Sequence, residues 1–380
     1  MIQHILSLGP LYIIAFIAVI SIVVFVHEFG HYWVARRCGV KIEVFSIGFG
    51  REIFGWNDKN GTRWKVSWLP LGGYVKMYGD ATGASTPAND VYSMTTEQKR
   101  VAFFHQSVDK RMAVVVAGPA TNYLFAVVVL AFLFMFQGQP YSLPDIKTVV
   151  PDSVAARAGL EAGDRVISLD GSKVERFEDI QRTIALNAGT PVEMRVMRGG
   201  TEVNLSVTPQ IVTTTDHFGG EHKVGRIGIT SGTVEYKKWP PLQAFGAALT
   251  DTWNITAGTL RAIGQMVAGS RGTEELGGPL RIAEMAGNVA KDGIVPLISL
   301  MAYLSINLGL INLFPIPLLD GGHLMFYAYE RVRGKPASES WHEIGMRVGI
   351  ILVVSLMVFT FWNDLFMHFK IVSLIRSLLS

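Results

Sequence analysis

The sequence is poor in cysteine and in charge. It contains 380 residues but one cysteine, Cys38, which excludes an internal disulfide framework and a cysteine-based zinc cluster. We expect Cys38 to be a lone buried or interfacial thiol. Charged residues make up 17% of the chain and hydrophobic residues 49%, whereas soluble domains are roughly 25% charged. The chain is therefore expected to be part membrane protein and part water-soluble. Its net charge of +3 and the lack of a basic stripe give no indication of a nucleic-acid partner.

The first ten residues contain no lysine or arginine. A cleaved signal peptide has basic residues before its apolar core and a small-residue cleavage site after it. Here the apolar run from Leu11 to Val26 leads instead into the sequence HEFGHYWVARR. We therefore expect a retained membrane helix in this region.

Four segments are long and apolar enough to span a bilayer, which takes about 20 residues. They run from Leu11 to Trp33, Met112 to Phe136, Ile294 to Phe314 and Ile344 to Trp362. Lysine and arginine gather in the loop between spans one and two and in the loop between spans three and four. This bias predicts that both loops are cytoplasmic and that the 138–293 segment lies outside.

The loop between spans one and two has a pattern of β-structure. Thr62–Gly79 alternates apolar and polar residues and contains the pair Gly72-Gly73, which predicts strands of a hairpin. Because the segment is apolar and lies next to the membrane, we expect a re-entrant or interfacial sheet.

The outer segment begins with a compact module, Val149–Pro209. Its pattern is strand, short helix, strand, turn, helix, strand, hairpin, strand, with the runs Ala156–Leu160 and Gly163–Ile167. It resembles a PDZ domain of the bacterial protease-associated kind, which implies binding of an extended peptide as an added strand. A small β-rich domain without a peptide ligand is the alternative. Pro240–Gly269 has helical spacing and is expected to lie along the outer membrane surface or to pack against this module.

His27 and His31 follow the first apolar run, at a depth where ionisable groups are costly. Four residues apart on a helix, they share one face and could both bind one zinc ion at about 2.0–2.1 Å. Glu28 lies one step round the helix, where it could touch a water on the metal. This HExxH arrangement is typical of zinc proteases in which the glutamate is the general base. A polar face packed inside a helical bundle is the alternative interpretation.

Two histidines leave a ligand set incomplete, because catalytic zinc normally has three protein ligands and one open position. Candidates for the third ligand lie where Pro315 and Pro317 interrupt the third span and free backbone carbonyls. Asp320 is favoured, partly through the resemblance described next, because a cation would neutralise its charge. His323 is the alternative ligand, or it holds Asp320 in place from outside the ligand set.

Three membrane motifs resemble those of the site-2 protease family, and more narrowly its bacterial regulator-of-sigma-E-protease branch. The motifs are HEFGH in the first span, GPATN at 118–122 and NLFPIPLLDGG in the third span, with FSIGFG at 45–50 and LGGYVKM at 71–77 as further matches. The resemblance implies zinc (Zn2+) bound by His27, His31 and Asp320, with Glu28 catalytic. It further implies that the substrate backbone is held by a set of residues outside the metal: Asn312, Pro315, Pro317, and Gly72 and Gly73 at the hairpin edge.

Two features qualify the resemblance. Well-known members of the branch carry two tandem PDZ modules, whereas one is found here and 210–293 does not repeat its pattern. The GPATN run is interpreted as a small-residue packing face between spans, with a functional role for Asn122 as the alternative.

The sequence therefore predicts a polytopic α-helical membrane protein with four transmembrane helices, a membrane-associated β-hairpin region and one extracytoplasmic PDZ domain. Residues 1–137 and 294–380 form the membrane core, 138–210 the PDZ domain and 211–293 an amphipathic region. The predicted activity is intramembrane zinc proteolysis of single-pass membrane proteins in the bacterial inner membrane. The resemblance implies an anti-sigma factor and remnant signal peptides as substrates. A catalytically silent PDZ scaffold and a metal transporter are the alternatives, although a transporter would often show internal repeats, which are absent here.

Overall fold

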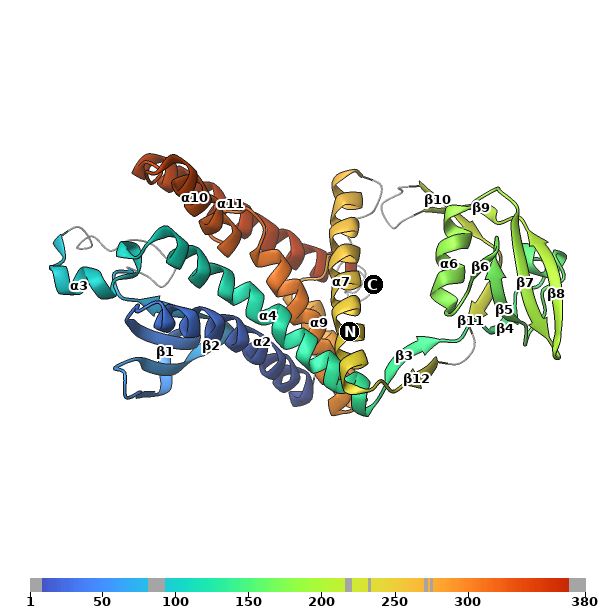
Figure 1. Ribbon diagram of the computed structural model, residues 1–380, viewed down its shortest axis with the longest axis horizontal. Coiled ribbons are helices and arrows are strands. Elements are labelled where there is room, and N and C mark those ends of the chain that lie inside the picture. Colours follow the sequence, from blue (N-terminus) through green and yellow to red (C-terminus); the bar gives the residue numbers. More distant parts are fainter. Residues whose placement is uncertain are drawn as a thin grey trace, which may run out of the picture. The chain divides into compact units, whose positions relative to one another are not determined.

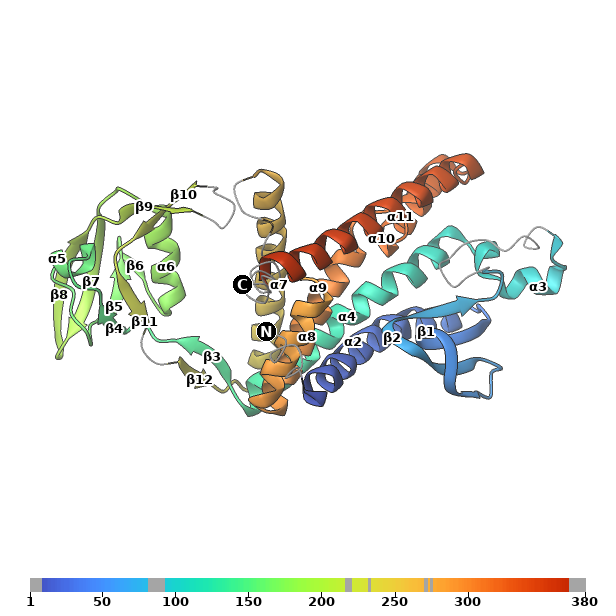
Figure 2. The ribbon, with the colours of Figure 1, turned by 180° about the vertical axis from the view of Figure 1, so that it is seen from behind.

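The computed structural model describes residues 9–80, 93–215, 221–231, 234–269, 273 and 276–368. The chain divides into two compact units (Figures 1 and 2). The first comprises residues 1–131, 248–259 and 276–380 and holds the long apolar helices; the second comprises residues 132–247 and 260–275 and holds most of the short strands.

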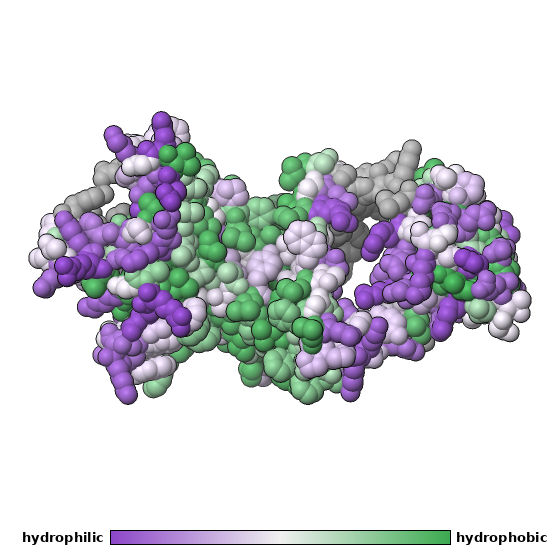
Figure 3. Space-filling view, in the orientation of Figure 1, coloured by the Kyte–Doolittle hydropathy of each residue, from purple (hydrophilic) through white to green (hydrophobic). Residues whose placement is uncertain are grey.

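Four helices in the described residues are long and apolar enough to cross a membrane, as predicted. They are α2 (Pro10–Arg37), α4 (Val108–Phe136), α9 (Ile294–Asn312) and α11 (Glu339–Trp362). Many large apolar side chains on them face outward, and the surface over these helices is mainly apolar in Figure 3. A helix that is apolar all round is typical of an apolar surrounding such as lipid. Cys38 directly follows α2 and is a free, half-buried thiol.

Shorter helices fill the first unit. They are α3 (Thr96–Val101), the 3-10 turn η2 (Phe103–His105), α8 (Pro279–Lys291), α10 (Asp320–Arg333) and the π-helical turn η4 (Asn363–His368). The carboxylate of Asp364 accepts hydrogen bonds from the backbone N–H groups of Gly278, Leu280 and Arg281. These bonds satisfy the free donors at the start of α8 and fix it to the chain that follows α11.

The β-region of the first unit consists of two long antiparallel strands, β1 (Ile42–Asn57) and β2 (Arg63–Met77). The turn between them lies at 58–62, so the pair Gly72-Gly73 falls inside β2 instead of at the turn. Residues 44–47 pair with 63–66 on one side and with 73–76 on the other. The second half of β2 therefore forms an edge of this sheet.

The second unit contains the module predicted at Val149–Pro209. A sheet with the order β6-β5-β7-β8 is built from β5 (Arg165–Leu169), β6 (Ser172–Lys173), β7 (Val192–Arg198) and β8 (Thr201–Val207). Helices α5 (Val154–Arg157) and α6 (Phe177–Leu186) complete the pattern. Its core is formed by apolar side chains from both helices and the sheet, including Ala155, Ile180 and Val196.

This unit does not end at residue 210, where the sequence placed a boundary. Strand β11 (Ile229–Ser231) pairs with β4 (Ile146–Val149), and β12 (Val234–Lys237) pairs with β3 (Gln139–Ser142). A further hairpin is formed by β9 (Gln210–Thr215) and β10 (Glu221–Arg226). The first part of the predicted 211–293 region therefore belongs to the strand-rich unit. Local patterns could not show this, because the pairing joins segments about 80 to 100 residues apart.

The helix predicted at Pro240–Gly269 is present as α7 (Pro241–Val267). Its middle part belongs to the first unit. There the hydroxyl groups of Thr256 and Tyr123 of α4 lie 3.3 Å apart, and Thr259 Oγ1 donates to Asn307 Oδ1 of α9. Polar side chains thus join α7 to two of the long helices.

Candidate metal centre

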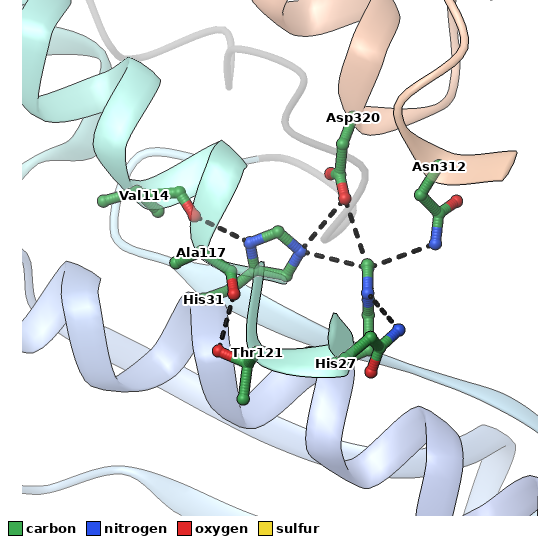
Figure 4. A network of polar contacts seen from close by, with 8 residues as sticks. His27, His31, Val114, Ala117, Thr121, Asn312 and Asp320 are labelled. Atoms are coloured by element: carbon green, nitrogen blue, oxygen red, sulfur yellow. Dashed lines mark hydrogen bonds and ion pairs between the residues drawn. The ribbon is translucent and has the colours of Figure 1, made fainter. Parts of the chain in front are cut away.

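The two histidines of α2 are buried and face each other (Figure 4). Their Nε2 atoms lie 3.2 Å apart, and the ring planes are nearly perpendicular. Each ring turns its other nitrogen towards α4: His31 Nδ1 lies 2.8 Å from the carbonyl oxygen of Val114, and His27 Nδ1 lies 3.2 Å from Asn122 Nδ2. Since a carbonyl can only accept, His31 donates from Nδ1–H, and in the neutral ring this tautomer leaves the lone pair on Nε2.

Asp320, the first residue of α10, completes a group of three possible metal ligands. Its Oδ2 atom lies 3.2 Å from His27 Nε2 and 3.5 Å from His31 Nε2. Among the described residues, no hydrogen-bond donor satisfies this buried oxygen. Three ligands of a tetrahedral zinc ion with bonds of 2.0–2.1 Å stand about 3.3–3.4 Å apart. The three atoms therefore have the spacing and the unsatisfied acceptor that such an ion requires.

Glycine allows α4 to approach this group closely. A Cβ atom at Gly118 would overlap with the imidazole of His31 and lie 2.8 Å from His27 Cε1. A Cβ atom at Gly30 of α2 would overlap with the carbonyl oxygen of Ala117. The GPATN run is thus a packing face, as expected, but the partners of that face include the two histidine rings.

The chain between α9 and α10 makes a tight turn that carries Asp320 to the histidines. Leu318 has φ of 98°, a conformation that is unusual for a residue other than glycine. Cβ atoms at Gly321 and Gly322 would overlap with main-chain carbonyl groups of this turn. Pro317 packs against α11, where a Cβ atom at Gly349 would overlap with the Pro317 carbonyl oxygen. The glycines of the LDGG run are therefore explained by close main-chain packing.

A cavity of about 390 Å³ adjoins the three ligand candidates. Glu28, Asn312 and His323 line it, together with Gly72 and Gly73 of β2. The Nδ2 atom of Asn312 lies 3.4 Å from His27 Nε2 (Figure 4). Glu28 packs beside β2, since a Cβ atom at Gly73 would lie 3.2 Å from Glu28 Cγ.

Two of the site residues implied by the resemblance are not in the cavity lining. Pro315 is exposed, and Pro317 is half-buried beside α11. Their neighbours Leu318 and Leu319 line the cavity instead. His323 lies in the lining but not in the group of three, so the favoured ligand candidate is the one that meets the histidines.

Gly118 and Asn122 contact the histidines, whereas the sequence favoured a packing face for the GPATN run and left a functional role for Asn122 as the alternative. A signal was available in their spacing: Val114, Gly118 and Asn122 recur at intervals of four, which places them on one face of a helix. The spacing does not say what this face packs against, and only the structure shows that it meets His27 and His31.

Four helices of membrane-spanning length, with two histidines and an aspartate that converge beside a cavity, are the features expected of a membrane metalloprotease. A family model described as peptidase family M50 matches residues 15–356, and the chain belongs to this family. It is a zinc metalloendopeptidase of the site-2 protease type. This class replaces the scaffold and transporter alternatives.

Relatives support the same class. A protein of Agrobacterium fabrum is 42% identical over 359 residues, covering 93% of this chain and 95% of its own, and one of Brucella suis is 44% identical over the same shares. Both carry names that describe zinc metalloproteases. Metalloprotease MmpA of Caulobacter vibrioides is 36% identical over 377 residues, covering 93% of this chain and 95% of its own. A solved PDZ domain of an SdrC-like protein from Listeria monocytogenes matches 24% of this chain and 88% of its own at 23% identity, with a TM-score of 0.20.

Proposed function

We propose that His27, His31 and Asp320 hold the catalytic zinc ion and that Glu28 is the general base. The observation that carries this proposal is the triangle of Nε2, Nε2 and Oδ2 atoms, with sides of 3.2, 3.2 and 3.5 Å. A buried carboxylate oxygen that has no hydrogen-bond donor is costly, and a cation held between it and the two imidazole nitrogens would offset that cost.

Each residue of the site has a separate task. Zinc bound there supplies a Lewis acid and brings the pKa of a bound water towards 7. Glu28 accepts the proton of the attacking water and delivers it to the leaving amine. Asn312 donates from Nδ2 to the carbonyl oxygen of the substrate, where negative charge develops. The turn at 313–319 joins Asn312 to Asp320 and sets the position of one relative to the other.

The edge of β2 is the proposed docking place for the substrate backbone. Gly72, Gly73 and Val75 line the cavity, and within the described parts of the chain 73–76 pair with β1 on one side only. A substrate strand added to this edge would run past Glu28. A helical peptide bond is shielded by its own hydrogen bonds, so pairing with β2 would also keep the substrate extended for attack.

The proposed substrates are single-pass membrane proteins, cut within or near the spanning segment in the bacterial inner membrane. The metal site lies in the half of α2 that ends in Arg36 and Arg37, and such basic residues favour the cytoplasmic side. The strand-rich unit would then be periplasmic and screen incoming substrates. An anti-sigma factor and remnant signal peptides are the substrates that the family resemblance favours.

The test uses the full chain in proteoliposomes with a tagged single-pass substrate. The wild-type chain should release a fragment cut in or beside the spanning segment. Glu28→Gln should keep zinc at the wild-type level but abolish cleavage, because the amide cannot accept the proton. Cleavage by Glu28→Gln at the wild-type rate would remove Glu28 as the base, and cleavage far from the spanning segment would contradict the proposed substrate class.

A further inference from the structure

Asn122 is a fully buried amide in the middle of α4, beside His27. Its Nδ2 atom lies 3.2 Å from His27 Nδ1. Its main-chain carbonyl accepts a hydrogen bond of 3.0 Å from Ser305 Oγ of α9. Asn122 is therefore fixed between two of the long helices, with its side chain directed at one imidazole.

The unpartnered amide oxygen of Asn122 favours one of the two orientations of its side chain. Within the part of the chain that the structure describes, this buried Oδ1 atom has no hydrogen-bond donor. The oxygen and nitrogen of an amide can be exchanged by a rotation of 180° that leaves its outline unchanged. After the exchange, Oδ1 faces His27 Nδ1 and accepts a hydrogen bond from it, so the orphaned acceptor is satisfied.

The two orientations have opposite effects on His27. If the amide nitrogen donates to Nδ1, the ring proton must sit on Nε2, directed at His31 and Asp320, and that nitrogen cannot bind a metal. If Oδ1 accepts from Nδ1, the lone pair of Nε2 is free. Val114 already plays this part for His31 through its carbonyl oxygen. Outer hydrogen bonds of this kind fix the tautomer and orientation of metal-binding histidines.

We propose that Asn122 is a positioning residue: its Oδ1 accepts a hydrogen bond from His27 Nδ1–H and so directs Nε2 of His27 at the metal. The inference rests on the proposed function, because it takes His27 as a zinc ligand. Residues at intervals of four on α4, Val114 and Asn122, thus orient the two imidazoles from behind.

The test compares variants of the full chain by their zinc affinity, measured by competition with a chelator, and by the visible spectrum of the cobalt-loaded protein. Asn122→Leu keeps most of the volume but has no acceptor, and it should bind zinc roughly 10- to 100-fold more weakly with an altered cobalt spectrum. Asn122→Asp keeps the acceptor and should stay within a few-fold of wild type. Tyr123→Phe removes a neighbouring hydroxyl that lies 3.3 Å from the Thr256 hydroxyl, and it serves as the matched control.

A packing role would give the reverse order, with Asn122→Leu close to wild type and Asn122→Asp impaired, and that result would overturn the inference. If the variants fail to fold, ¹⁵N NMR of histidine-labelled, zinc-free wild-type protein decides: a neutral His27 ring with its proton on Nδ1 is expected, and a neutral ring with its proton on Nε2 contradicts the inference. Failure of the proposed function is distinguished by His27→Ala. Zinc affinity that stays unchanged in that variant would remove His27 as a ligand.

Discussion

The main chain of Gly118 lies against the imidazole of His31, so closely that a methyl group at position 118 would overlap with the ring. This contact joins the second long helix to the metal-binding face of the first. The position of both histidine rings therefore depends on position 118 of α4 being glycine.

Gly118→Ala is expected to displace both rings and to weaken zinc binding by at least roughly tenfold, the lower end of the effect of losing an outer contact. Chelator competition on the purified full chain measures the effect. Gly258→Ala in α7 is the matched control, because no atom of the described residues lies within 4 Å of its added methyl group. Equal zinc affinity of Gly118→Ala and the control would show that α4 does not constrain the site.

Gly349 of α11 should matter for catalysis through the turn at 313–319. A side chain there would overlap with the carbonyl oxygen of Pro317, so Gly349→Ala should shift the turn that positions Asn312 and Asp320. We expect slower cleavage, with a change in kcat larger than that in KM, because the reacting groups move apart. Gly264→Ala is the control, because the added methyl group has no neighbour within 4 Å in the part of the chain that the structure describes. Wild-type kcat in Gly349→Ala would argue against this coupling.

Two ion pairs join α4 to α10, and we expect them to contribute differently to the stability of the fold. Arg111 and Glu330 lie 2.7 Å apart with side chains only 10% and 15% exposed, and Arg111 also lies over the ring of Tyr327. Removing one partner of a buried pair costs about 3–5 kcal/mol, because the other charge is left uncompensated. Glu330→Ala should therefore clearly lower the thermal unfolding temperature.

The second pair is the internal control for the first. Arg331 and Asp109 lie 2.8 Å apart but are 63% and 68% exposed, and exposed pairs contribute about 0–1 kcal/mol. Asp109→Ala should leave the unfolding temperature nearly unchanged. Equal destabilisation by the two variants would contradict the assignment of Arg111 and Glu330 as the link between α4 and the helix that carries Asp320.

The strand-rich unit should lose stability in acid through Asp164, which is 1% exposed. Burial alone would raise the pKa of this carboxyl, but hydrogen bonds from Arg198 and from the backbone N–H of Glu161 lower it below its usual range. A carboxyl with a lowered folded-state pKa stabilises the fold above its unfolded pKa of about 3.9, and this contribution is lost as the pH falls through the folded-state pKa.

Hydrogen exchange of the β7 amides, corrected for intrinsic rates, measures this effect in the full chain. Asp164→Asn should reduce protection at pH 7 roughly fivefold or more and should flatten the loss of protection below about pH 4. Glu202→Gln removes the charge of one partner of the exposed ion pair between Arg195 and Glu202, and it is the control. The same acid sensitivity in Asp164→Asn and wild type would exclude Asp164 as its source.

Local patterns account for part of this structure. A run of apolar residues predicts each long helix. A spacing of four places His27 and His31 on one face of a helix, whatever surrounds them. The meeting of Asp320 with these rings is different, because it depends on a turn with Leu318 in a rare conformation. No spacing rule indicated that contact. Asp320 was favoured because it follows the interrupted third span, because a cation would neutralise its charge, and partly through the family resemblance.

Long-range contacts account for what was missed. The return of β11 and β12 to β4 and β3 moved the end of the strand-rich unit past residue 210. The contacts of Gly118 and Asn122 with the histidines depend on which face of α4 meets α2. Both outcomes depend on packing between distant segments, which the periodicity of a single segment cannot report.

X-ray absorption at the zinc edge of the purified full chain tests the central claim most directly. We predict one zinc per chain with only nitrogen and oxygen ligands at about 2.0–2.1 Å and the scattering of two imidazoles, reduced to one imidazole in His31→Ala. Loss of one oxygen ligand is expected in Asp320→Ala. A sulfur ligand at about 2.3 Å, or a spectrum unchanged by both substitutions, would contradict the assignment of the metal to His27, His31 and Asp320.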